Sequence, residues 1–165
     1  MSLFSIDLLA AMVSGISGYK NLKFAKKEEK ALLNEVLEEF FFNLNLVRND
    51  YIKNGLELEA IIRLLKISRL EAAEKARKRN RLDFNKIRTG IISRSCFISN
   101  HQVKYYSSFD TERLLLKLRD KFTELKKVRK LYYARGKWKQ GINPKRRMSN
   151  ILDLLELISN HLSEK

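Results

Sequence analysis

The residues that could move protons are few in this chain. His101 and His161 are its two histidines, and Cys96 is its single cysteine. Arg94 precedes His101 with six residues between them. An imidazole can transfer a proton near neutral pH, and a guanidinium can hold a phosphate through two hydrogen bonds. Arg94 and His101 are therefore the candidate catalytic residues.

The spacing of Arg94 and His101 resembles the R-x4–6-H motif of the HEPN-family ribonucleases. The resemblance covers these eight residues alone, and Ser95 replaces the polar residue that the family favours just after the arginine. It implies a small all-α protein, often a dimer, in which the pair polarises the phosphate and moves a proton on the 2′-hydroxyl. One alternative is thus a metal-independent ribonuclease. We favour the other expectation, in which the protein is not an enzyme, Arg94 is a surface arginine and His101 is a loop histidine.

The remaining reactive side chains have structural explanations. Cys96 precedes Phe97 and Ile98, so we expect it to be a small core residue. His161 is expected near a helix end, where the dipole favours an imidazolium. Glu35 and Glu39 should lie on a solvated helix face, because they lack the Glu-x-x-His partners of a di-iron bundle. Two histidines and one cysteine cannot build a Cys/His zinc cage, so we expect no metal and no cofactor.

The elements that carry these residues are predicted to be helices. One proline and six glycines are too few for the many turns of an all-β fold. Apolar and capping patterns predict helices over 3–24, 26–53, 56–66, 68–80, 110–134 and 144–162. Residues 81–108 should be irregular. The expected fold is a single-domain all-α bundle of about five to seven helices.

Individual patterns make these predictions specific. A heptad seam marks 26–53, at Leu33, Leu37, Phe40, Leu44, Val47 and Tyr51. Ser68 and Glu71 have the spacing of a capping box. Asp110 should cap the long helix, whose inner face is Leu115, Leu118, Phe122, Leu125, Val128 and Tyr132. Asn143–Pro144 should start the last helix, with Met148, Ile151, Leu155, Ile158 and Leu162 buried.

Positive charge is confined to one part of the chain. The whole sequence has a net charge of +15, yet residues 1–68 balance nine Lys and Arg against nine Asp and Glu. Residues 69–147 hold 24 basic and seven acidic residues. We therefore divide the domain 1–165 into a neutral scaffold (1–67), a basic segment (68–147) and a C-terminal helix (148–165).

Two groups of cations within the basic segment form the candidate nucleic-acid-binding surface. One crowds a helix end, and the other is an acid-free tract whose aromatic rings could stack on exposed bases. The candidate residues are Lys75, Arg77, Lys78, Arg79 and Arg81, together with Lys126, Lys127, Lys130, Arg135, Lys137, Trp138, Lys139, Lys145, Arg146 and Arg147.

These observations favour a non-enzymatic, basic helical protein that binds RNA or DNA or belongs to a nucleoprotein assembly. Residues 1–55 are the expected surface for a protein partner or a second copy. Another alternative is a helical adaptor or membrane-surface protein with an acidic partner, and the apolar stretch 3–19 could touch a membrane. A single cysteine and no recognisable signal sequence suggest a cytoplasmic protein.

Overall fold

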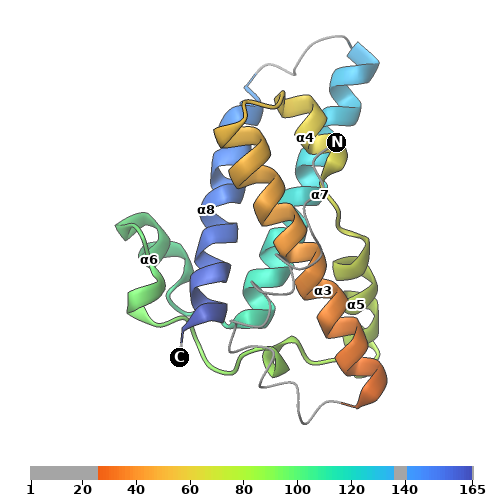
Figure 1. Ribbon diagram of the computed structural model, residues 1–165, viewed down its shortest axis with the longest axis vertical. Helices are drawn as coiled ribbons and strands as arrows, with labels where there is room; N and C mark the ends of the chain where they lie inside the picture. The colour runs from red at the N-terminus through yellow and green to blue at the C-terminus, as the bar shows by residue number, and fades with distance from the viewer. Residues whose placement is uncertain (1–25, 136–140, 165) are drawn as a thin grey trace.

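The computed structural model describes residues 26–135 and 141–164, which form an all-α bundle (Figure 1). The α-helices in these ranges are α3 (Lys27–Asn45), α4 (Leu58–Leu64), α5 (Ser68–Lys78), α6 (Asn100–Tyr106), α7 (Thr111–Arg135) and α8 (Pro144–Ser163). The described part has no strand, only an isolated bridge between Ile91 and Asp110. The all-α prediction is confirmed, while the predicted helix 3–24 lies outside the described residues.

Helices α3, α7 and α8 pack together, and α5 lies against both α3 and α7 (Figure 1). Their facing stripes form one hydrophobic core. The predicted apolar positions of all three long helices are buried, except that Tyr51 and Tyr132 are only partly so. Burial of these stripes is the main force that holds the helices together.

The predicted helix 26–53 changes its winding near its end. After Asn45 the chain continues as a π-helix, η2 (Leu46–Lys53), which the apolar spacing did not predict. Gly55 has a φ of 68°, a left-handed conformation that glycine adopts at low cost. The predicted stop at Asn54–Gly55 is therefore confirmed.

The start of α5 is capped by a different residue from the one predicted. Ser68 and Glu71 form no capping box. Instead the Glu39 carboxylate, from the middle of α3, accepts hydrogen bonds from the backbone N–H groups of Arg69 and Leu70, both at 3.0 Å, and from the Ser68 hydroxyl at 3.2 Å. Glu39 is 6% exposed, so the prediction of a solvated face was wrong for this residue. A carboxylate suits this position because it satisfies free N–H groups and opposes the positive helix end.

Two further glutamates are buried against the basic segment. Glu29 of α3 accepts from the Asp83 N–H at 3.0 Å and from Lys86 Nζ at 2.7 Å. Glu74 of α5 pairs with Arg119 of α7 and with Lys78. Burial tends to raise the pKa of both carboxyls, but these cationic partners outweigh it and hold each pKa below 4.5.

The predicted irregular segment is confirmed between α5 and α7. It contains the short 3₁₀ turns η3 (Phe84–Lys86) and η4 (Arg94–Cys96) and the two-turn helix α6, which projects to the left in Figure 1. Hydrogen bonds anchor it, such as that from Gln102 Nε2 to the Asp153 carbonyl at 3.1 Å. Among the described residues, we find no helix with the length and apolar character needed to cross a bilayer.

Candidate functional site

The predicted basic surface is divided between two regions of the molecule. Arg77, in the first group of cations, pairs with Glu112 in the first turn of α7, with 2.9 Å between Nη1 and Oε1. Lys126, in the second group, follows fourteen residues later on the same helix. At 1.5 Å per residue this places the two groups about 21 Å apart along α7.

The first group is partly neutralised by internal ion pairs. Arg77 is bound to Glu112, and Lys78 Nζ lies 2.9 Å from Glu74 Oε1. The side chains of Lys75, Arg79 and Arg81 are exposed. The group therefore presents fewer free cations to a ligand than its sequence suggests.

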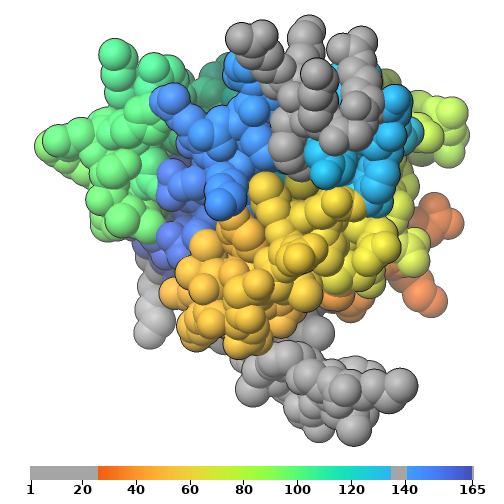
Figure 2. Space-filling model, turned by 90° about the horizontal axis from the view of Figure 1, so that it is seen from above, coloured from red at the N-terminus to blue at the C-terminus, as the bar shows by residue number. Residues whose placement is uncertain are grey.

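The second group combines the end of α7 with the start of α8, which lie at the same end of the molecule (Figure 2). Four cations there are exposed and have no ion pair within the described ranges: Lys127, Lys130, Lys145 and Arg146. Arg147 differs, because its Nη1 lies 3.0 Å from Glu124 Oε2. Lys126 is half-buried, and this burial lowers its pKa. We call the four free cations the α7–α8 basic surface.

The backbone of α8 adds to this positive region. The Asn143 side chain accepts from the Arg146 N–H at 3.0 Å, and Pro144 occupies the first turn, as predicted. The helix begins beside a hollow of about 290 Å³ that Lys121, Arg146, Arg147 and Glu124 line. The N-terminal end of a helix carries partial positive charge, which complements anions.

Acidic residues border the α7–α8 basic surface on one side. Glu57 and Glu59, at the start of α4, share a second hollow with Tyr132 and Lys145. The surface is therefore not uniformly positive, because Lys145, one of its four cations, lines this hollow together with the two carboxylates. Lys127 and Lys130 lie on α7 itself and line neither hollow.

Aromatic rings accompany the cations of α7. Tyr133 is 53% exposed, and its ring lies edge-on to that of Tyr132 with 5.8 Å between centroids. The Arg129 guanidinium lies 4.7 Å from the centre of the Tyr133 ring, and its Nη2 donates to the Tyr133 hydroxyl at 3.3 Å. Lys137, Trp138 and Lys139 lie outside the described residues, as does the side chain of Arg135.

The candidate catalytic residues lie on neighbouring elements of the irregular segment. Arg94 starts η4, and both side chains are exposed. The prediction of a loop was wrong for His101, which lies in the first turn of α6 because the Ser99 side chain caps this helix. The His101 ring packs against Tyr105, 4.6 Å between centroids. No hydrogen bond joins His101 to Arg94 in the described part of the chain. The ribonuclease alternative stays a prediction.

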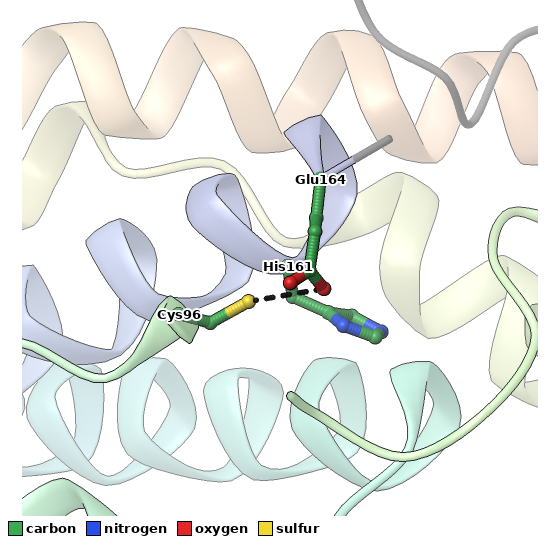
Figure 3. A group of neighbouring side chains, drawn as sticks. All are labelled: Cys96, His161 and Glu164. Carbon is green, nitrogen blue, oxygen red and sulfur yellow. Dashed lines mark hydrogen bonds between the residues drawn. The ribbon is translucent and has the colours of Figure 1, made fainter. Parts of the chain in front are cut away.

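A cluster of two buried residues and one partly exposed residue brings together three donor groups that no sequence pattern connected. The thiol of Cys96, a ring nitrogen of His161 and a carboxylate oxygen of Glu164 all lie within 4.8 Å of one another (Figure 3). Cys96 is 3% exposed and His161 is fully buried. The Cys96 thiol donates to Glu164 Oε2 at 3.5 Å. The burial of Cys96 confirms that it is a core residue.

Hydrogen bonds fix the orientation of the Glu164 carboxylate. Ser93 and Ser95 donate to Oε1, and Arg88 Nη2 lies 3.0 Å from Oε2. The bonds from Ser93 and Ser95 lower the pKa of Glu164 from 4.5 to about 2. The carboxylate is therefore negative at neutral pH and held in one place.

The expectation of an imidazolium at His161 was wrong. Burial, assisted by the positive charge of Arg88, lowers the pKa of His161 from 6.5 to about 4, so the ring is neutral. The Thr111 hydroxyl donates to the Arg88 carbonyl at 2.7 Å, so its oxygen must accept from His161 Nε2–H, 3.0 Å away. Nδ1 therefore carries a lone pair, and it is buried without a hydrogen-bond partner in the described structure. An unsatisfied buried polar group costs about 1–3 kcal/mol.

One sequence signal could have placed His161 in the core. It follows Leu154 and Ile158 at steps of four and three, in register with the buried stripe of α8. No local pattern connects it to Cys96, because the two residues are distant in sequence.

Comparison with known proteins adds no further assignment. No protein-family model, no curated protein and no solved structure matches this chain.

Proposed function

We propose that this protein binds the phosphate backbone of nucleic acid through the α7–α8 basic surface. One observation carries the proposal: the last turns of α7, which contain Lys127 and Lys130, lie at the same end of the molecule as the start of α8, which contains Lys145 and Arg146 (Figure 1). Each of these side chains is exposed and lacks an internal ion pair among the described residues. Free cations in such a group can replace the counterions of phosphates.

The neighbouring rings support single-stranded nucleic acid as the ligand. Tyr133 exposes about half of its side chain beside Arg129. An exposed ring next to cations allows a base to stack while the adjacent phosphates are bound. Bases of a duplex are already stacked on each other and cannot use such a ring. We therefore expect single-stranded RNA or DNA to bind more tightly than a duplex of the same length.

The direct test is the salt dependence of binding. Fluorescence anisotropy of a labelled single-stranded oligonucleotide should show affinity that falls steeply between low and moderate salt. Reversing charge in a triple variant, Lys127→Glu, Lys130→Glu and Lys145→Glu, should weaken binding more than tenfold. For three lost phosphate contacts, the slope of log affinity against log salt should fall by about 2.

The control variant reverses the same number of charges elsewhere. Lys30, Lys53 and Lys104 are exposed, lie on three different elements and form no ion pair within the described residues. A Lys→Glu triple at these positions changes net charge equally and should retain most of the affinity. Equal losses in the two triples would show that only net charge matters, and binding that is flat with salt would refute the proposal.

A further inference from the structure

We propose that Cys96, His161 and Glu164 form a binding site for one Zn²⁺ ion. The three donor atoms converge within 4.8 Å from two separate parts of the chain, η4 and the end of α8 (Figure 3). The proposal is independent of nucleic-acid binding. It rests on the convergence, on the free lone pair of His161 and on the groups that hold the donors in place.

The free lone pair is the observation that points to a ligand. His161 is fully buried, and its Nε2–H is committed to Thr111, so Nδ1 remains as an unused acceptor. A buried polar atom without a partner is rare in folded proteins and calls for an unseen water or ion. The thiol of Cys96 and the carboxylate of Glu164 are the neighbouring groups that could share such an ion with it.

The surrounding hydrogen bonds resemble those that orient metal ligands in general. A ligating histidine usually donates its other N–H to an oxygen, and here Nε2–H donates to Thr111, which in turn donates to the Arg88 carbonyl. A ligating carboxylate is usually hydrogen-bonded as well, and Ser93 and Ser95 donate to Glu164 Oε1. These bonds leave Oε2 facing the thiol.

The types of donor select zinc among common cations. Thiolate and imidazole suit Zn²⁺, whereas Mg²⁺ and Ca²⁺ prefer oxygen ligands throughout. Zinc bonds of about 2.0–2.3 Å place tetrahedral ligand atoms about 3.6 Å apart. The Cys96 and Glu164 atoms are already 3.5 Å apart, and all three donor atoms lie within 4.8 Å of one another, so shifts of about 1 Å would give tetrahedral spacing.

Binding changes the protonation of the cluster in a defined way. The Cys96 S–H bond breaks, the thiolate binds Zn²⁺ through its sulfur, and the proton is released to solvent. The neutral His161 ring binds without losing a proton. Arg88, beside Oε2, opposes the added positive charge, and the two negative ligands Cys96 and Glu164 balance the ion. Three protein ligands leave one tetrahedral position for water.

The test measures zinc uptake by the full chain after removal of any affinity tag and of bound metal. Titration of Zn²⁺ against a chromophoric chelator should give one ion per chain. Cys96→Ser should lower the affinity at least tenfold, whereas His101→Ala, which removes the exposed histidine, should leave it unchanged. No stoichiometric uptake, or equal affinity in wild type and Cys96→Ser, would overturn the proposal.

Two further measurements guard against variants that fail to fold. Thr111→Val keeps the size of the side chain but removes the hydroxyl that fixes the imidazole, and zinc affinity should fall about tenfold to a hundredfold. Co²⁺ bound in place of Zn²⁺ should give a thiolate-to-cobalt charge-transfer band in the wild-type protein. Co²⁺ bound without that band would exclude Cys96 as a ligand and overturn the site.

Discussion

Acidification should destabilise this protein through His161 at pH values above those at which carboxyl groups contribute most. In the unfolded chain the imidazole takes up a proton near pH 6.5, but in the folded protein its pKa is about 4. Between these values the unfolded state binds more protons, so the free energy of unfolding must fall as the pH falls. The stabilisation is fully present above pH 6.5 and is lost on the way down to about pH 4.

The size of the effect follows from the shift. One pKa unit corresponds to about 1.4 kcal/mol, so acidification from pH 6.5 to 4.5 should remove about 2–3 kcal/mol. The window ends at 4.5 because Glu29, Glu74 and Glu164 have pKa values below 4.5 in the folded protein, so most of the stability that they contribute is lost below that pH. Between pH 6.5 and 4.5, His161 therefore accounts for most of the dependence of the free energy of unfolding on pH.

The assay is urea unfolding followed by far-ultraviolet circular dichroism, with a chelator present, across this pH window. His161→Gln removes the titrating group and should flatten the dependence of unfolding free energy on pH. The slope is compared rather than the absolute stability, because the substitution can also alter packing. His101→Ala serves as the control, and an equal slope in wild type and His161→Gln would refute the reasoning.

Two other predictions concern polar residues of α3. Glu39→Gln should lower the free energy of unfolding by about 1–3 kcal/mol, because an amide has only one acceptor oxygen for the N–H groups of α5. As the control, Glu38→Gln at the exposed neighbouring position should change this free energy by less than about 0.5 kcal/mol in the same urea assay. Equal effects of the two substitutions would contradict the role of Glu39 as a cap. Asn43→Ala should cost about 1–3 kcal/mol, because the amide accepts from the Lys66 N–H at 2.9 Å and donates to its carbonyl at 2.6 Å. If thermal unfolding of Asn43→Ala occurred at the wild-type temperature, these two hydrogen bonds would make no net contribution to stability.

The helices could be predicted because their signals are local. Asp110 Oδ1 accepts from the Arg113 N–H at 2.9 Å, and Asn143 caps α8, as the sequence indicated. The apolar stripes of α3, α7 and α8 are buried where their period placed them. Such patterns need only a few neighbouring residues, and the helix itself determines which side chains share a face.

The contacts that the sequence did not predict join distant residues. Glu39 is 31 positions from Leu70, and Glu164 is 68 positions from Cys96. Nothing in the local sequence distinguishes these carboxylates from solvated ones. A residue's partner then depends on how whole helices pack, which spacing alone does not determine.

The distribution of charge along the sequence indicated where the cations lie, but not which of them are free to bind a ligand. The candidates Arg77, Lys78 and Arg147 form ion pairs with carboxylates, whereas Lys127 and Lys130 form none with the residues that the structure describes. Counting charges along the chain cannot separate these two classes. Only the structure shows which cations remain free for an external ligand.

The cap that Glu39 provides for α5 makes this helix dependent on an earlier part of the chain. The start of α5 has no side-chain cap of its own, and its two N–H groups bind a carboxylate from α3. During synthesis α3 leaves the ribosome first, so the acceptor already exists when Arg69 and Leu70 emerge. The same order holds for Glu29 and its later partner Lys86. Carboxylates from the neutral part of the chain thus bind backbone and side-chain groups of the basic part.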